Sequence, residues 1–228
     1  MFKRAAKISF WILLISGWII LSGFVTNYYD ELTLENIEIN FINDNSQKFI
    51  TKSEVNSMLL LMGIVNNVSI KKEIQIASIE KKLLNHSAIR NAQVYFNNNG
   101  DLKVDITKRT PIARFVSSVF EKNFYIDKRG FLMPISKTYV SRVPIFSGEI
   151  NFPERLDLNI LDSLHRTAIF QEIYKMSKLI NNDTFLKSQI VQIHINNNSY
   201  FELIPRIGNQ RILFGSSENM ENKFKKIK

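Results

Sequence analysis

The residues that could carry out chemistry in this 228-residue sequence are few and lie far apart. Cysteine is absent, which excludes disulfides, thiolate metal sites and cysteine nucleophiles. The three histidines, His86, His165 and His194, are isolated, and the sequence contains no Gly-x-Ser-x-Gly, His-Glu-x-x-His or glycine-rich phosphate-binding motif. We therefore predict no catalytic residue, no cofactor site and no metal site.

Two aspartates, Asp101 and Asp105, are the candidates for paired-acid chemistry, because both fall on the same face of a predicted strand. Paired carboxylates hydrolyse glycosidic bonds when a cleft holds them at a suitable separation. On a short hairpin we interpret them instead as part of a solvated face. The basic pairs Lys71-Lys72, Lys81-Lys82 and Lys108-Arg109 have no accompanying aromatic stacking pattern, so nucleic acid is not an expected partner.

The feature with a binding mechanism is a pair of strands near the C-terminus. Tyr200 to Ile204 and Arg211 to Phe214 are predicted strands with no closing partner in the sequence. An unpaired strand edge can be completed by another chain through β-augmentation. The candidate partner-binding residues are Tyr200, Glu202, Ile212 and Phe214. The strands predicted between Ala92 and Ile106 offer a second possible edge.

An apolar stretch, Ile8 to Val25, determines where these strands are expected to lie. It contains no charged residue, and as a helix it reaches about 27 Å, close to the thickness of a bilayer's hydrocarbon core. Basic residues precede it and acidic residues follow it, which predicts a cytoplasmic stub over residues 1–7 and export of the rest. A cleaved signal peptide is the alternative. Because Ser22 to Val25 lacks a small-x-small cleavage pattern, we favour a retained transmembrane helix over residues 8–25.

The exported part is predicted to form two domains after a connector over residues 26–34. Residues 35–110 read as strand, helix, helix, strand, strand. Thr51 to Glu54 is a capping box before a helical stripe, Ile76 to Leu84 is a second helix, and Asn99-Gly100 joins two alternating runs in a tight turn.

Residues 111–228 predict a mixed, mostly antiparallel β domain with one long helix, so the fold class is α+β. Asp127 to Gly130 reads as a hairpin turn, and the long helix runs from about Leu158 to Ile180. After Ser217 we expect a lysine-rich helix that completes no buried face. We therefore expect the C-terminal end of this domain to be incomplete.

This order of elements resembles the bacterial cell-division family FtsQ, called DivIB in some lineages. The segments that carry the resemblance are Ser87–Val94, Asn99–Val104, Lys108–Arg114 and Phe124–Gly130. The resemblance implies a POTRA domain over residues 35–110 and a single-pass protein of the bacterial inner membrane, with periplasmic domains at the division septum. It also implies the partner proteins FtsB and FtsL. Family members continue past a helix like the one near Glu218 into a further strand.

These observations give one leading hypothesis and two alternatives. The leading hypothesis is a non-enzymatic scaffold that links inner-membrane and periplasmic division proteins through edge-strand contacts. The first alternative is a membrane-anchored periplasmic peptidoglycan hydrolase that uses Asp101 and Asp105. The second is a POTRA-bearing unit for outer-membrane assembly, which would require a β-barrel after the POTRA domain. We expect no cofactor and no small-molecule substrate.

Overall fold

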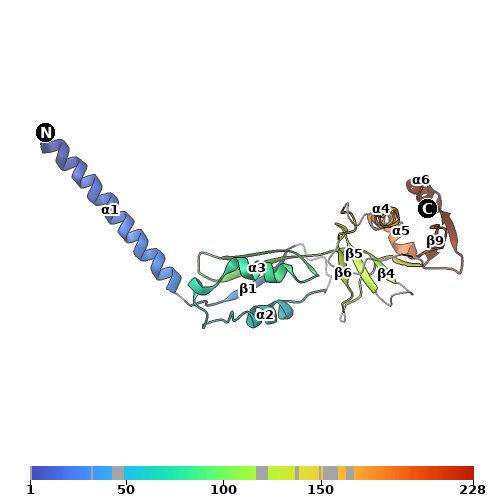
Figure 1. The fold of residues 1–228 in the computed structure, drawn as a ribbon, viewed down its shortest axis with the longest axis horizontal. Helices are drawn as coiled ribbons and strands as arrows, with labels where there is room; N and C mark the ends of the chain where they lie inside the picture. The colour runs from blue at the N-terminus through green and yellow to red at the C-terminus, as the bar shows by residue number, and fades with distance from the viewer. Residues whose placement is uncertain are drawn as a thin grey trace. The chain divides into compact units, whose positions relative to one another are not determined.

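A computed structural model gives the fold of the chain (Figure 1). It describes residues 2–31, 33–42, 49–116, 123–136, 139–148, 150, 159–162 and 167–228. The chain divides into two compact units. The first is built from Met1–Ile42, Thr51–His86 and Asn91–Thr107, and the second mainly from Lys108–Lys228.

Helix α1 (Phe2–Glu31) contains the apolar stretch and extends beyond the predicted residues 8–25 at both ends. Large apolar side chains from Phe10 to Leu21 are exposed along it. Among the described residues, no helix qualifies as long and apolar enough for a membrane span. The predicted transmembrane helix is therefore not shown and stays a prediction.

The first unit contains a three-stranded sheet in the order β1-β3-β2. Strand β1 (Ile37–Ile42) runs parallel to β3 (Leu102–Lys108), and β2 (Ile89–Phe96) lies on the other side of β3. The turn before β3 uses Gly100 at φ +83°, a left-handed conformation that favours glycine. This confirms the predicted order strand, helix, helix, strand, strand.

Two helices cover the apolar face of this sheet. Helix α2 (Lys52–Leu61) begins with the predicted capping box, in which the Thr51 hydroxyl accepts from the Glu54 N–H at 3.2 Å and the Glu54 carboxylate accepts from the Thr51 N–H at 2.7 Å. A 3-10 turn, η1 (Lys71–Glu73), leads to α3 (Ile76–Leu84), whose bounds match the prediction. The buried side chains of this core are Ile39, Val55, Leu59, Ile79, Leu83, Ala92, Val94, Leu102, Val104 and Ile106.

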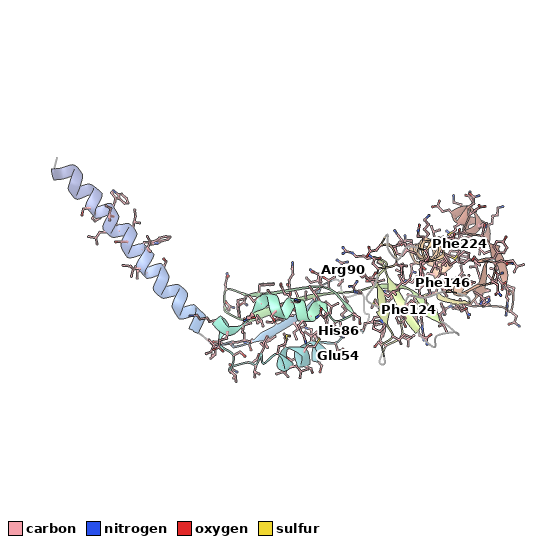
Figure 2. All side chains as sticks on the ribbon, in the orientation of Figure 1. Glu54, His86, Arg90, Phe124, Phe146 and Phe224 are labelled. Atoms are coloured by element: carbon pink, nitrogen blue, oxygen red, sulfur yellow. The ribbon has the colours of Figure 1, made fainter. Side chains whose placement is uncertain are left out.

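His86 follows α3 and is half-buried in the first unit, near Glu54 (Figure 2). Burial lowers the pKa of His86, because a charged imidazolium loses hydration there, and the nearby Glu54 carboxylate opposes this shift with a smaller effect. The folded state therefore binds a proton at His86 less readily than the unfolded chain does.

We predict that His86 lowers the stability of this unit as the pH falls below the ordinary histidine pKa of about 6.5. In that range the unfolded chain binds the proton more readily than the folded unit does, so the free energy of unfolding decreases as the pH falls. Urea unfolding at a series of pH values from 8 to 5, for the unaltered chain and His86→Gln, measures the effect. The variant should show a shallower loss of stability, and equal slopes would contradict the prediction.

The second unit is built on a seven-stranded sheet in the order β10-β9-β8-β7-β4-β5-β6. Its strands are β4 (Pro111–Val116), β5 (Asn123–Asp127), β6 (Leu132–Pro134), β7 (Ile145–Gly148), β8 (Ile190–Ile195), β9 (Phe201–Pro205) and β10 (Ile212–Gly215). Strand β7 is parallel to both β4 and β8, and the other described pairings are antiparallel. This confirms a mixed, mostly antiparallel β domain.

The last residue of the central strand β7 is a glycine with an unusual conformation. Gly148 has φ +109°, and a Cβ atom at this position would collide with the backbone carbonyl of Ile195 on β8. Glycine is therefore required where the ends of β7 and β8 approach each other.

Three helices pack against one face of this sheet. They are α4 (Ala168–Asn182), α5 (Thr184–Gln189) and α6 (Met220–Ile227). Their buried side chains join those of the strands in one core, in which Phe115 stacks on Phe124 and Phe146 at ring distances of 5.1 and 5.7 Å. Figure 2 labels Phe124, Phe146 and Phe224 of this core.

Two expectations about these helices need correction, and one helix was missed. The long helix was predicted from Leu158, but Asn159 forms a bridge to Phe131 and the next residues form a turn, while residues 151–158 and 163–166 lie outside the described part. Helix α5 was not predicted. The lysine-rich helix is present as α6, but it buries Met220 and Phe224, so the expectation of no completed buried face is wrong.

A buried carboxylate holds the predicted hairpin between β5 and β6. Asp127 is 1% exposed and accepts hydrogen bonds from Arg109 Nη1 at 2.9 Å and from the N–H groups of Arg129 and Phe131 at 2.8 and 2.9 Å. The Arg109 guanidinium also lies over the Phe131 ring, 4.4 Å from its centroid. One side chain thus fixes both the turn and the start of β4.

We predict that Asp127→Ala destabilises the second unit by about 3 kcal/mol, because it leaves the half-buried Arg109 guanidinium and two turn N–H groups without their acceptor. Urea unfolding of the full chain, followed by circular dichroism, measures this loss. The matched control is Arg211→Ala, which removes an exposed ion pair with Glu202 at 3.6 Å and should cost less than about 1 kcal/mol. Equal losses for the two variants would contradict the prediction.

Candidate partner-binding edge

Strand β10 lies at one end of the seven-stranded sheet. It pairs with β9 in an antiparallel register, with Ile212 opposite Leu203 and Leu213 opposite Glu202, and a bulge follows before Gly215. Among the described strands, none pairs with the outer side of β10. Its outward N–H and C=O groups are therefore available to an added strand.

The opposite end of the sheet is less suited to strand addition. Strand β6 has only three residues and ends at Pro134, which lacks the N–H that a ladder requires. A short edge that contains proline is a usual protection against pairing with another chain. Of the two ends, β10 is the better template.

The second predicted edge, in the three-stranded sheet, is partly occupied from within. Strand β2 forms one side of that sheet, and the Val94 N–H donates to the carboxylate of Glu80, on α3, at 2.8 Å. An incoming strand that used this N–H would have to displace a charged acceptor. Strand β10 has no such contact from a described side chain to the backbone N–H groups of Ile212, Leu213 or Phe214.

Helix α6 holds β10 in place from the core side. The Phe214 and Phe224 rings lie 4.8 Å apart, and Lys223 donates to the Ser216 carbonyl at 2.9 Å. The Lys223 ammonium also lies 5.1 Å from the centroid of the Phe214 ring. The edge strand is therefore ordered by its own domain before any partner binds.

The far end of α6 is tied to α5 by an ion pair between Lys228 and Asp183. Asp183 also caps α5, accepting from the N–H groups of Phe185 and Leu186 at 3.1 and 3.0 Å. The hydrogen bond from Lys228, and then the one from Leu186, lower the pKa of Asp183.

The candidate residues differ in accessibility. Phe214 is 5% exposed and Ile212 is half-buried opposite the buried Leu203, so both face the core. Leu213, between them, is 80% exposed and was not among the candidates. Because Arg211 to Phe214 is apolar at three successive positions, the alternation of the sequence does not indicate which face is solvated.

The other two candidates lie on and beside β9. Glu202 is half-buried, faces Leu213 across the strands and approaches Arg211 at 3.6 Å. Tyr200 precedes β9 and is exposed, and its N–H donates to the Asn196 side chain at 3.0 Å. Leu213, Glu202 and Tyr200 thus provide accessible side chains next to the free edge.

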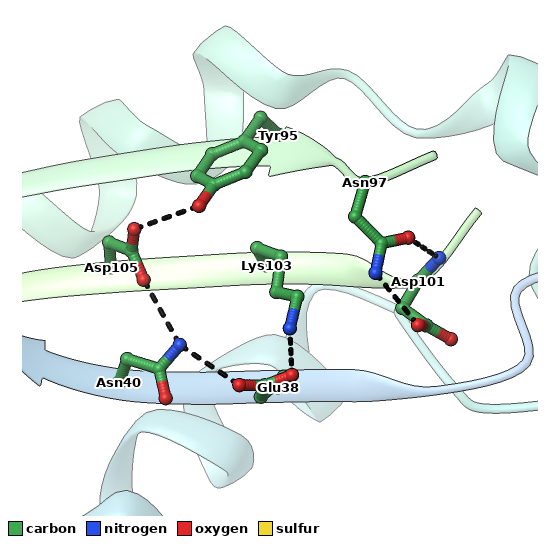
Figure 3. A network of polar contacts seen from close by, with 7 residues as sticks. All are labelled: Glu38, Asn40, Tyr95, Asn97, Asp101, Lys103 and Asp105. Atoms are coloured by element: carbon green, nitrogen blue, oxygen red, sulfur yellow. Dashed lines mark hydrogen bonds and ion pairs between the residues drawn. The ribbon is translucent and has the colours of Figure 1, made fainter. Parts of the chain in front are cut away.

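The aspartates considered for hydrolysis belong to a polar network on the three-stranded sheet (Figure 3). Asp105 accepts from Asn40 Nδ2 at 3.2 Å and from the Tyr95 hydroxyl at 3.0 Å, and Asp101 accepts from Asn97 Nδ2 at 2.9 Å. The hydrogen bond to Asp105 raises the pKa of Tyr95. Each carboxylate is engaged by neutral donors of the sheet.

The neighbouring charges in this network neutralise each other. Lys103 on β3 forms an ion pair with Glu38 on β1. The hydrogen bond between them lowers the pKa of Glu38 and raises that of Lys103. This arrangement is typical of a solvated sheet face, as predicted.

The described residues contain no group of three or more histidine, aspartate or glutamate side chains that could hold a metal ion. His194 lies 3.4 Å from the Ser147 hydroxyl, which also accepts from Gln192 Nε2 at 2.8 Å. His165 lies outside the described residues.

Comparison with protein-family models gives two matches, which together cover nearly all of the chain after α1. A model described as FtsQ/DivIB, C-terminal related, matches residues 110–228, slightly more than half of the sequence. A model described as a POTRA-like domain matches residues 34–107. No curated protein matches the chain.

We predict that Phe214→Ala destabilises the second unit by about 3 kcal/mol, because it removes a buried ring packed on Phe224. Leu213→Ala, one residue away, should cost less than about 0.5 kcal/mol because its side chain is in water. Thermal and urea unfolding of both variants test the assignment of faces. A larger loss for Leu213→Ala would show that the register of β10 is the reverse.

Proposed function

Because the chain belongs to the FtsQ/DivIB C-terminal-related family, we propose that it is a non-enzymatic scaffold of the bacterial division machinery. In this proposal it links inner-membrane and periplasmic division proteins at the septum. The observation that carries the proposal is the family match over residues 110–228, the same region that ends in the free edge of β10.

The partners that we propose are FtsB and FtsL, bound through the edge of β10. An added strand gains main-chain hydrogen bonds along β10, and the exposed Leu213 supplies apolar contact area next to the half-buried Glu202. Tyr200 can extend this surface. Because Ile212 and Phe214 face the core, we propose that they support the edge and that Leu213 touches the partner.

The proposed location is the inner membrane, with α1 as a single span and the two units in the periplasm. In support, α1 exposes a continuous set of large apolar side chains, among them Trp11, Leu13 and Trp18. The Ser16 and Ser22 hydroxyls donate back to the carbonyls of Leu13 and Ile19 at 3.0 and 2.8 Å. Internal satisfaction of polar groups is what a helix in lipid requires.

Anchoring in the membrane raises the effective concentration of the scaffold's partners. A protein confined to the membrane plane meets its partners in two dimensions, so weak edge-strand contacts are populated without high intrinsic affinity.

The alternative of a peptidoglycan hydrolase relied on Asp101 and Asp105. Both carboxylates lie within the polar network of the sheet, so no arrangement of these residues favours that alternative.

We predict that Leu213→Asp weakens binding of the full chain to FtsB and FtsL by at least about tenfold, because it places a charge at the edge that receives the added strand. Co-purification from detergent extracts of cells that express the three proteins, followed by titration of the purified complex, measures the change. Cells that depend on this variant should form filaments.

The matched control is Val140→Asp, which changes a residue of similar character that is 62% exposed on the same unit. This variant should bind as the unaltered chain does. Unchanged binding by Leu213→Asp, in a variant that unfolds at the usual urea concentration, would contradict the proposed edge.

We predict that the full chain stays in the membrane fraction after washing with alkaline carbonate. Replacing Ile15 and Ile19 together with arginine should move much of it to the soluble fraction, because each arginine costs about 3 kcal/mol at the centre of a span. Replacing the exposed Ile207 of the second unit with arginine should leave the distribution unchanged. Release of the unaltered chain by carbonate would contradict the anchor.

A further inference from the structure

The end of α2 and the loop that follows it, in the first unit, expose aliphatic side chains. Leu61 is 89% exposed and Val68 is 69% exposed, and Leu60 and Ile70 beside them are also exposed. We refer to these four residues as the apolar loop surface. Isolated exposed aliphatic residues are common on proteins, but four of them at the end of α2 and in the segment that follows it are a sign of an interaction site.

The loop holds this surface in a fixed conformation. The Ser69 hydroxyl donates to the Gly63 carbonyl at 3.1 Å and accepts from the Val65 N–H at 2.9 Å. The Ile64 N–H donates to the Leu59 carbonyl at 3.1 Å. These hydrogen bonds therefore fix the loop from Gly63 to Ser69, which carries the exposed Val68.

The same loop is hydrogen-bonded to the chain that leaves α1. The Leu34 N–H donates to the Ser69 carbonyl at 2.8 Å, the Asn67 N–H donates to the Leu34 carbonyl at 2.6 Å, and Thr33 forms a bridge with Ile70. Helix α1 ends at Glu31, two residues before Thr33. Two extended residues span about 7 Å, so Ile70 is held close to the end of α1.

The chemistry around the loop fits a lipid surface. A cleft of about 510 Å³ next to it is lined by aliphatic side chains that include Met62, Ile64 and Val68, together with the polar residues Ser69, Glu73, Gln75 and Ser78. Lys71 and Lys72 follow Ile70 directly. Aliphatic side chains enter the boundary between headgroups and acyl chains, and lysines beside them can reach anionic headgroups.

We propose that the apolar loop surface docks on the lipid bilayer next to the end of α1 and holds the POTRA-like unit against the membrane. This inference rests on the proposed anchoring of α1. The short tether selects lipid as the occupant, because the end of a spanning helix lies at the membrane surface and the loop cannot move far from it.

The test uses the full chain in vesicles of phosphatidylethanolamine and phosphatidylglycerol. Because the sequence contains no cysteine, Leu61→Cys and Lys52→Cys each give one site for an environment-sensitive fluorophore. Lys52 is exposed at the other end of α2, about 14 Å away along the helix axis. Spin-labelled lipids should quench the fluorophore at position 61 at least about twofold more than that at position 52. A label at Val68→Cys should behave like the one at position 61.

The two tryptophans of the chain, Trp11 and Trp18, both lie in α1 and report its insertion separately through quenching by brominated lipids. If the tryptophans are quenched and positions 61 and 52 respond equally, the docking proposal is overturned and the anchor stands. If the tryptophans are not quenched, the anchor fails, and the docking proposal fails with it. Shielding of position 61 only after FtsB and FtsL are added would assign the surface to a protein partner and would also overturn the proposal.

Discussion

The packing of Phe214 on Phe224 is the interaction on which the candidate binding edge depends. It joins the last strand to the last helix, and the contact between Lys228 and Asp183 joins that helix to α5. Among the described strands, β10 has a neighbour on one side only, so it has ladder hydrogen bonds on that side alone to keep it extended. Because the core already orders β10, binding of a partner strand does not have to offset the conformational entropy that β10 would lose on becoming ordered.

The two units protect sheet edges against strand addition in different ways. In the POTRA-like unit the Glu80 carboxylate occupies an outward N–H of β2, and in the second unit Pro134 ends β6. Both devices reduce pairing with unrelated chains. The polar network from Glu38 to Asp105 keeps the open face of the three-stranded sheet hydrated, so that unit has little apolar area available on this face. Closing an edge against unrelated chains contributes to specificity as much as leaving another edge open does.

Much of the fold follows from local sequence signals. The capping box at Thr51, the bounds of α3 and the turns at Gly100 and Gly130 were all predicted, because each depends on residues within a few positions of one another. Helix α5 was missed because its six residues are too few to show a helical stripe, although Asp183 at its start is a usual capping residue. The buried face of α6 was missed because it packs on other elements of the domain, as Phe224 does on Phe214 of β10.

The candidate site was predicted at the level of the strand but not of the side chain. The buried face of a strand can be assigned from the sequence only when apolar and polar residues alternate. Ile212, Leu213 and Phe214 are all apolar. Which of them meets solvent depends on the pairing with β9 and on the bulge before Gly215, and both are set by tertiary structure.

Gly148 shows how narrowly one backbone position can limit the variation that this domain accepts. Any side chain there would push against Ile195 on β8, and β8 carries β9 and β10 beyond it. A library that samples every amino acid at position 148 should therefore retain glycine alone. Such invariance would reflect the geometry of the sheet centre and not contact with any partner.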